Sequence, residues 1–394
     1  MPRDSNKDLN NLINSYSALK EWKNRDDIRL SPKQKNSARL AVDHFLIKDV
    51  LNSLDLKDCL ANKNYKILFA HFSPFLNELE GLGLPAFASR FLPNCLIDFT
   101  YDKGNEKASV FRIIDDKILK LDQLEEKYDL IIARSSVLIN MMKRQYDKTV
   151  LENSSYKINI KTMSYKPNYK FADYYFDEED MCPPADPSYL QRSNTFLEKN
   201  RKENLIAVSG TLWKVKNQLS MFEQLDPDIT KDYSFVILGP ERDINYTNRI
   251  RQVCENKRLK YFLVGSVCRE LACEIKSLSK LSIIPMDMRV FGQPKGYPRT
   301  LGESIGSKCL TICNKPVTIP AFYKDTCRVY NEEIPNDLNL VLEKSIHTVS
   351  DKNFITQHNW GTSTFNDICK ETIIKCLNLY EQNHKESAKA KMVS

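Results

Sequence analysis

Glycine, histidine and tryptophan are scarce in this 394-residue sequence, with 11, 5 and 3 copies. The histidines, at positions 44, 71, 347, 358 and 384, stand far apart, and no two have the spacing of zinc ligands. The eleven cysteines include no CxxC pair, so they fit neither a zinc site nor a disulfide framework. We therefore expect reduced, mostly buried thiols and no structural metal.

Long apolar runs and dense basic runs are also lacking. No stretch reaches the length of a membrane span, and the first twenty-five residues contain no apolar segment of the kind that a signal peptide requires. We expect a cytoplasmic protein. The net charge of +7 is spread along the chain without an aromatic array, which argues against a nucleic-acid partner. A content of 42% hydrophobic and 28% charged residues is typical of a globular protein, and the length suffices for two domains.

Short apolar runs alternate with helical patterns in the second half of the sequence. Each run is nearly continuous in apolar character and ends in glycine, proline or a small polar residue, as parallel strands covered on both faces do. Segments of suitable length for crossover helices lie between them, so we predict a doubly wound α/β domain. The predicted strands are 205–211, 233–240, 261–267, 281–287 and 309–315.

The first half repeats this pattern less regularly and predicts a second α/β domain. We expect strands at 65–72, 94–102, 109–115 and 129–136, and helices at 85–92, 116–126 and 136–147. The proline-containing segment 177–204 is interpreted as the connection between the domains. The resulting division is an N-terminal arm or peripheral helix (1–30), a first domain (31–200), a second domain (201–350) and a C-terminal helix with a tail (351–394).

Residues that follow the predicted strands are the candidates for ligand binding, because open α/β sheets bind ligands at the carboxyl ends of their strands. After the first strand of the second domain, Gly210 permits a tight turn, and Lys216 stands at the start of the next helix, where an ammonium group suits a diphosphate. Gly239 and Gly265 follow the next two strands, where glycine lets a base or ribose approach the backbone. Simple turn formation is the better explanation of either glycine taken alone.

The segment QPKGYPRTLGESIG, residues 293–306, contains three of the eleven glycines and two of the seventeen prolines. It follows the fourth strand, so we expect a loop at the mouth of the sheet and then a helix capped by Thr300. Glu303 would either complete a capping box with Thr300 or accept two hydrogen bonds from ribose hydroxyls. The spacing leaves both roles open.

Together these segments resemble the donor domain of glycosyltransferases of the GT-B fold, in particular the retaining family 4 group. The resemblance covers about residues 204–335, through GTLWKVKNQ, VILG, FLVGSV, SIIPM and GYPRTLGES. HNW, followed by a long helix ending in LYEQ, extends it. It implies two Rossmann-like doubly wound domains facing a cleft, with a C-terminal helix that crosses back to the first domain.

The resemblance also implies an activity, which is transfer of a sugar from a nucleotide-sugar donor to a glycan, lipid-linked or other acceptor, with retention and without a metal cofactor. The family's G-x5-K element maps onto Gly210 and Lys216, and the second glutamate of its E-x7-E element maps onto Glu303. Lys216 and Glu303 are therefore the expected catalytic residues. The other expected donor-binding residues are Thr211, Lys214, Gly239, Gly265, Val267, Lys295, Gly296, Pro298, Arg299 and Thr300, and the acceptor-side residues are His71, Glu78, Gly81, Gly83, Arg134 and Ser135.

Two departures from the family pattern motivate alternatives. Lys295 stands where E-x7-E has its first glutamate, and Thr211 stands where an arginine often follows the first glycine. A non-catalytic binding or scaffold subunit would explain both. A sugar-nucleotide epimerase of the same fold would need acid and base groups in its cleft, which the scarcity of histidine disfavours. For an acceptor at a membrane face, the basic residues Lys143, Arg144 and Lys148 would suit peripheral membrane association, although a solvated helix face also explains them.

Overall fold

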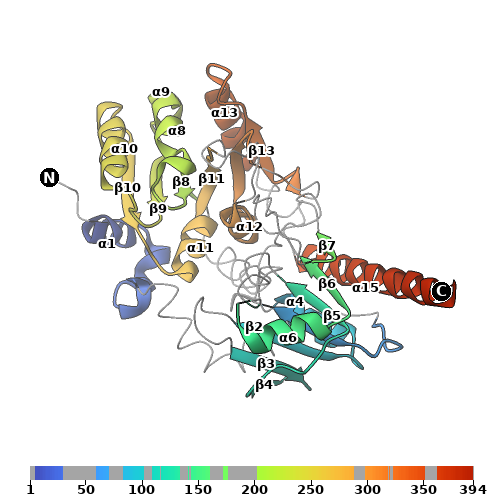
Figure 1. Ribbon diagram of the computed structural model, residues 1–394. Coiled ribbons are helices and arrows are strands. Elements are labelled where there is room, and N and C mark those ends of the chain that lie inside the picture. Colours follow the sequence, from blue (N-terminus) through green and yellow to red (C-terminus); the bar gives the residue numbers. More distant parts are fainter. Residues whose placement is uncertain are drawn as a thin grey trace. The chain divides into compact units, whose positions relative to one another are not determined.

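A computed structural model describes residues 5–29, 59–70, 83–101, 109–115, 117–133, 141, 143–159, 172–175, 202–287, 298–317, 319, 323–350 and 362–393. The chain divides into two compact units (Figure 1). The first unit comprises Arg39–Ser188 and Thr362–Ser394, and the second unit comprises Met1–Ala38 and Tyr189–Gly361. Each unit is built around one β-sheet.

The second unit contains a sheet of six parallel strands in the order β10-β9-β8-β11-β12-β13. The five predicted strands are confirmed, and the short edge strand β13 was not predicted. Most strand residues are buried, which explains why the sequence shows continuous apolar runs rather than alternation. The strands are β8 (Glu203–Ser209), β9 (Ser234–Leu238), β10 (Lys260–Gly265), β11 (Ser279–Ile284), β12 (Leu310–Asn314) and β13 (Cys327–Tyr330).

Helices cover both faces of this sheet. One group comprises α8 (Gln218–Gln224), α10 (Ile244–Asn256) and α13 (Asp337–Ser350), in which α8 packs against the other two. The other group comprises α11 (Arg269–Leu278) and α12 (Arg299–Gly306), which pack against each other. The four crossover helices predicted between the strands are thereby confirmed, and the domain is doubly wound. Two further short turns of helix, α9 (Pro227–Thr230) and η4 (Lys214–Lys216), lie in the connections.

The N-terminal segment also packs on the second unit. Its helix α1 (Ser5–Ser15) lies beside the edge strand β10 (Figure 1), and the buried Asp8 carboxylate accepts a hydrogen bond from the Leu263 amide at 3.0 Å. The turns η1 (Ser17–Trp22) and η2 (Asp26–Arg29) follow. The fully buried Trp22 indole donates a hydrogen bond to Glu274 on α11. The segment thus covers a sheet edge that would otherwise present unpaired backbone groups.

The sheet of the first unit has seven strands in the order β4-β3-β2-β1-β5-β6-β7. Strands β1, β2, β5, β6 and β7 run parallel, whereas β3 and β4 form an antiparallel extension at one edge. Its strands are β1 (Lys66–Ala70), β2 (Leu96–Tyr101), β3 (Ser109–Ile114), β4 (Lys117–Leu121), β5 (Leu130–Ala133), β6 (Tyr156–Asn159) and β7 (Tyr174–Tyr175), and α4 (Gly83–Phe91) and α6 (Gln145–Asn153) are among its helices.

The helix predicted at 116–126 is wrong, because this segment begins with strand β4. Asp115 adopts a positive φ of 47° in the turn after β3, and β4 then pairs with β3 so that Ile118 stands opposite Ile113. The β-branched run VFRII before the turn was the signal for a hairpin. Half of the helix predicted at 136–147 lies outside the described residues, and the described helix begins at Gln145. Strands β6 and β7 were not predicted.

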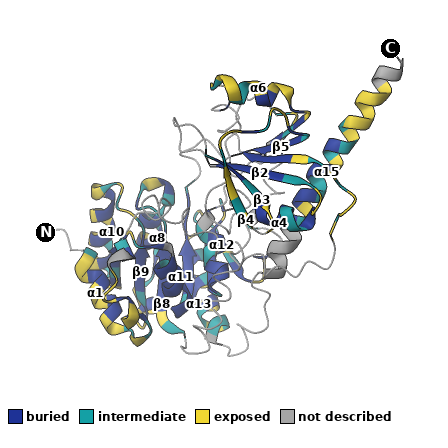
Figure 2. Cartoon of the chain, turned by 90° about the horizontal axis from the view of Figure 1, so that it is seen from below, coloured by how far each residue is buried: buried dark blue, intermediate teal, exposed yellow. Residues whose placement is uncertain are grey.

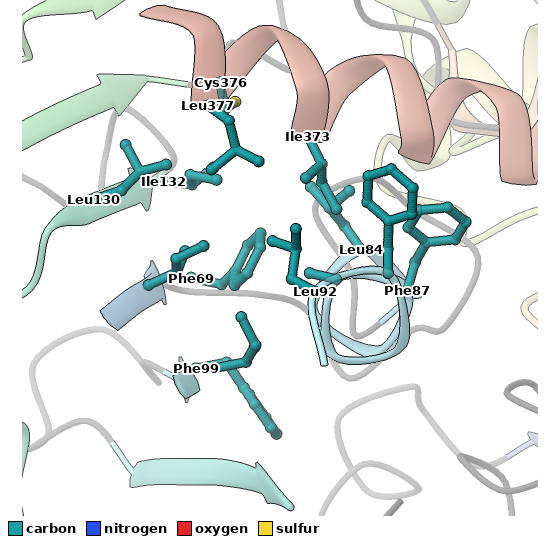
Figure 3. Packing of buried hydrophobic residues seen from close by; sticks show 14 of the residues in the cluster. Phe69, Leu84, Phe87, Leu92, Phe99, Leu130, Ile132, Ile373, Cys376 and Leu377 are labelled. Carbon is teal, nitrogen blue, oxygen red and sulfur yellow. The ribbon is translucent and has the colours of Figure 1, made fainter. Parts of the chain in front are cut away.

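The long C-terminal helix α15 (Thr362–Val393) returns to the first unit. Its buried residues, including Ile373 and Leu377, join one apolar cluster with Leu84 and Phe87 of α4 and with residues of the sheet (Figure 3). Past Tyr380 the helix becomes mostly exposed (Figure 2). The predicted fold class, two Rossmann-like α/β units with a C-terminal helix that returns to the first, is confirmed.

Ten cysteines fall among the described residues, and all are free thiols, eight of them buried as predicted. None of the described helices is long and apolar enough to cross a membrane. Within the same described ranges, no three histidine, cysteine or acidic side chains gather in an arrangement that could hold a metal ion.

Candidate active site

The strand order of the second unit fixes where a ligand can bind. From β8 the chain first adds β9 and β10 on one side and then crosses to β11, β12 and β13 on the other. The order of strands therefore reverses between β8 and β11. In open α/β sheets ligands bind outside the carboxyl ends of the strands at such a switch point. Lys216 and Glu303, the expected catalytic residues, stand in the segments that follow β8 and β11.

Three glycines end three neighbouring strands at this edge of the sheet. Gly210, Gly239 and Gly265 follow or end β8, β9 and β10, and all have positive φ, of 142°, 144° and 71°. A Cβ atom at position 239 would lie only 2.0 Å from the Gly210 carbonyl oxygen, so no larger residue fits there. The amides of Gly210 and Gly239 donate to Leu238 and Gly265 at 2.8 and 2.9 Å. The glycines thus allow the backbones of three loops to approach one another closely.

Lys216 folds back over Gly210. A Cβ atom at position 210 would meet Cγ and Cδ of Lys216 at 3.6 Å, which is ordinary van der Waals contact. Lys216 ends the turn η4, and the following Asn217 adopts a left-handed conformation with φ 52° and ψ 19° before α8 begins. The residues of the predicted G-x5-K element are therefore neighbours in space as well as in sequence.

A buried amide holds the loop after β8 in place. Gln218, 1% exposed, donates from Nε2 to the carbonyl oxygens of Thr211 and Gly210 at 3.1 and 3.4 Å. Its Oε1 atom lies 3.4 Å from the Tyr246 hydroxyl, which in turn accepts from the Leu219 amide at 2.9 Å. Burial raises the pKa of Tyr246 to about 12, so its hydroxyl stays protonated and can donate at neutral pH. Of the predicted donor-binding residues in this loop, Thr211 is half-buried and Lys214 is exposed.

An aromatic side chain and a guanidinium group stack at the outer end of the same loop. The guanidinium carbon of Arg242, which follows β9, lies 4.1 Å from the centre of the Trp213 ring. This distance is that of a cation–π contact. The stack joins the loop after β8 to the loop after β9, in addition to the hydrogen bond from the Leu212 amide to Pro240 at 2.9 Å.

Glu303 lies on α12 and forms a buried ion pair. Its Oε2 atom accepts a hydrogen bond of 2.6 Å from Nζ of Lys276 on α11, and the two side chains are 17% and 1% exposed. A charge-assisted hydrogen bond of this length between a buried ammonium group and a partly buried carboxylate holds the carboxylate in place. The remaining exposure of Glu303 leaves part of its side chain open to solvent.

Thr300 does not cap α12, which corrects the sequence prediction. The helix begins at Arg299, its N-cap residue is Pro298, and no side chain caps it. Thr300 is thus inside the helix, where its carbonyl accepts from the Ser304 hydroxyl at 2.9 Å. Glu303 is not the third residue after a capping threonine, so the capping-box role is excluded. A proline at position 298 favours the extended backbone seen there, which explains the earlier helix start.

The loop after β10 is fastened by the N-terminal segment. The Arg29 guanidinium donates to the carbonyl oxygens of Val264 and Ser266 at 2.5 and 2.8 Å, and the Cys268 amide donates to Ile28 at 2.6 Å. A Cβ atom at Gly265 would lie 3.6 Å from the same guanidinium. Val267, another predicted donor-binding residue, is half-buried and packs against the apolar cluster that this segment forms with α11.

The other predicted site residues begin a helix or lie outside the described residues. Arg299 is the first residue of α12 and Gly83 the first of α4, and these are backbone positions only. Five acceptor-side residues stand in the segments between β1 and α4 or after β5 in sequence and lie outside the described residues, as do two of the donor loop. These residues are His71, Glu78, Gly81, Arg134, Ser135, Lys295 and Gly296.

The basic residues proposed for membrane association are partly neutralised. Arg144 forms an ion pair with Asp147, and Nζ of Lys148 lies 3.6 Å from Oε1 of Glu152 on α6. The Lys148–Glu152 pair is exposed, as i,i+4 pairs on a solvated helix face are, whereas Arg144 and Asp147 are only partly exposed. The described contacts therefore favour the solvated-face interpretation of this segment.

Sequence reasoning missed Lys276, Glu332 and Asn314. Lys276 stands in a helix of mixed pattern, where nothing in the sequence separates a buried lysine from a solvated one. Glu332, which follows β13, accepts hydrogen bonds from the side-chain amides of Asn217 at 2.6 Å and Asn314 at 3.2 Å. Only for Asn217, the partner of Glu332, did the sequence carry a local signal, because asparagine adopts the left-handed conformation found there more readily than most residues do.

Comparisons with known proteins return solved glycosyltransferase structures. No family model matches the sequence. No curated protein matches it either. The catalytic domain of starch synthase IV from Arabidopsis thaliana, bound to ADP and acarbose, has 9% identity and a TM-score of 0.48, covering 80% of this chain and 99% of that one. An α-glucosyltransferase in complex with UDP and DNA has 13% identity and a TM-score of 0.48 over 80% and 100% of the two chains. A glycosyltransferase of avilamycin A biosynthesis has 11% identity and a TM-score of 0.42 over 65% and 75%.

Proposed function

We propose that this protein is a glycosyltransferase that takes its sugar from a nucleotide-sugar donor and holds the nucleotide at the switch point of the second unit. The observation that carries the proposal is the position of two opposite charges. Lys216 lies against Gly210 in the loop after β8, and Glu303 lies on the helix that follows β11. These loops flank the reversal of strand order, where ligands of such sheets bind.

The two charges suit two adjacent parts of a nucleotide sugar, the diphosphate and the ribose. Departure of a nucleoside diphosphate leaves an oxocarbenium-like sugar centre and places growing negative charge on the phosphates. The ammonium of Lys216, held by a loop whose backbone is pinned by Gln218, would stabilise that charge without reorganisation. The Glu303 carboxylate would accept hydrogen bonds from ribose hydroxyls. Retention of configuration, a glycan or lipid-linked acceptor and independence of a metal belong to the proposal through the resemblance to family 4.

The test is a titration of the purified protein with uridine, guanosine and adenosine diphosphates and their sugar derivatives, followed by thermal unfolding. At a ligand concentration a hundred times the Kd, binding would stabilise the protein by about 2.7 kcal/mol. We expect one base to stabilise it, and Lys216→Ala and Glu303→Ala to remove that effect. Lys231→Ala and Glu343→Ala, at exposed positions of the same unit, are the matched controls.

The remaining functions are distinguished by this titration together with a measurement of sugar-nucleotide consumption and of nucleoside diphosphate release. Stabilisation by no nucleotide, with all variants folded, would refute the proposal and favour a scaffold. Consumption of a sugar nucleotide in the absence of any acceptor, with no release of nucleoside diphosphate, would identify an epimerase. Release of nucleoside diphosphate that requires an added acceptor would establish transfer.

A further inference from the structure

We propose that Glu332 is a positioning residue that sets the conformation of the Lys216 loop through Asn217. The inference rests on the proposed function, because it assigns Glu332 a role in binding the donor diphosphate. Glu332 follows the edge strand β13, more than a hundred residues along the chain from the loop that it contacts. It therefore contributes to the site from a part of the sheet that the G-x5-K element does not include.

The first step is the backbone of Asn217. A left-handed conformation is costly for most residues with a side chain, and asparagine is among the few that adopt it readily. At Asn217 this conformation ends η4 and starts α8, so it sets the direction in which the chain leaves Lys216. The Asn217 side chain donates from Nδ2 to Oε2 of Glu332 at 2.6 Å. This hydrogen bond to a carboxylate stabilises the residue on which the course of the loop depends.

The second step is the anchoring of Glu332 itself. Its Oε2 atom also accepts from Nδ2 of Asn314 at 3.2 Å. Asn314 is fully buried at the end of β12 and exchanges two hydrogen bonds with the Met286 backbone, of 2.9 and 2.6 Å. The Glu332 carboxylate, which follows β13, is thus held by Asn314 at the end of β12. It in turn restrains the Asn217 side chain.

A third contact ties the same loops together by backbone atoms. The amide of Asp287, after β11, donates to the carbonyl of Val215 at 2.8 Å, one residue before Lys216. The turn that carries Lys216 is therefore held from the loops after β11 and β13. Val215 itself is buried, so the turn is anchored on the sheet while Lys216 remains half-buried.

Four variants test the inference by the affinity for the nucleoside diphosphate that binds best and for the corresponding nucleoside. Because it removes a hydrogen bond to a charged group, Glu332→Ala should weaken diphosphate binding by roughly tenfold or more and leave nucleoside binding unchanged. Glu332→Gln keeps an acceptor oxygen and should restore most of the affinity. Asn217→Gly permits the left-handed backbone but lacks the side-chain amide, so it should resemble Glu332→Ala. Glu333→Ala, at the exposed neighbouring glutamate, is the charge-matched control.

The double variant Asn217→Gly/Glu332→Ala should bind no more weakly than either single variant, because both remove the same hydrogen bond. Additive losses would overturn the inference, as would equal losses for diphosphate and nucleoside. Amide hydrogen exchange of residues 210–219 without nucleotide supplies a readout that needs no donor site, and we expect faster exchange in Glu332→Ala than in Glu332→Gln. Unchanged exchange refutes the role of Glu332. A wild-type protein that binds no nucleoside diphosphate refutes the proposed function instead.

Discussion

Replacing Lys276 by methionine should destabilise the second unit by about 3 kcal/mol. Breaking a buried ion pair by removing one partner costs about 3–5 kcal/mol, because the other charge stays in a poorly solvated place. The Lys276 side chain is 1% exposed and that of Glu303 is 17% exposed. Partial hydration of Glu303 therefore places the cost at the lower end of the range. Methionine is unbranched and apolar and fills the space of the lysine stem, so little of the cost should come from a cavity.

Urea unfolding followed by tryptophan fluorescence measures this effect in the right part of the molecule. The three tryptophans, at positions 22, 213 and 360, all belong to the second unit. A loss of about 3 kcal/mol should lower the urea midpoint by about 1 M or more, since the slope of unfolding free energy against urea is about 1–3 kcal/mol/M. Lys231→Met, at an exposed position of the same unit, should leave the midpoint unchanged.

A second substitution separates the ion pair from general packing. In Lys276→Met/Glu303→Gln the charge left by the first change is also removed, so the double variant should be more stable than Lys276→Met alone. A single variant that loses less than about 1 kcal/mol would refute the reasoning. A double variant that loses the sum of the two single losses would also refute it, because the residues would then not act as a pair.

Three further substitutions probe the close glycines, the N-terminal segment and the C-terminal helix. Gly239→Ala should lower the free energy of unfolding in the fluorescence-detected urea assay by more than the strained backbone alone would, which is about 1–3 kcal/mol. The reason is that its Cβ would also lie 2.0 Å from the Gly210 oxygen. Trp22→Phe removes the indole donor to Glu274 and should cost about 1–2 kcal/mol in the same assay, whereas no change would make that contact incidental. Ile373→Ala, at a position 2% exposed, should cost about 2–5 kcal/mol in unfolding followed by far-UV circular dichroism. It should leave the tryptophan transition unshifted, since a shifted one would contradict its assignment to the first unit.

The parallel core could be predicted from sequence because its strands are buried on both faces. The runs that became β8, β9 and β11 are short, rich in apolar residues and followed by glycine or proline, which is typical of strands buried on both faces. The edge strands could not be recognised in the same way. In β4 only Ile118 and Leu121 are even half-buried, and its lysines fit a helix surface equally well. Strand β13, with Val329 exposed, is short and shows no continuous apolar run.

In the candidate site, residues that directly follow a buried strand could be predicted, and residues held by contacts between distant elements could not. Gly210, Gly239 and Lys216 were predictable because a parallel strand, a glycine and a polar residue follow one another in sequence, and strand ends share one edge. Lys276 and Glu332 were not, because their partners come from other elements. The ion pair joins two helices, and the hydrogen bond from Asn217 spans 115 positions. Such pairings depend on tertiary packing, about which local patterns carry no information.

The chain passes between the two units three times, so each unit is built from two separate stretches of the sequence. The last segment, Thr362–Ser394, packs in the first unit, and Met1–Ala38 packs in the second. A cut after Ser188 would therefore give two fragments, each of which lacks part of its own core and carries a segment of the other's. The first would lose Ile373 and Leu377 from its apolar cluster, and the second would lose Trp22. Because burial of such side chains contributes most of the stability of a domain, the units depend on covalent continuity at both ends of the chain.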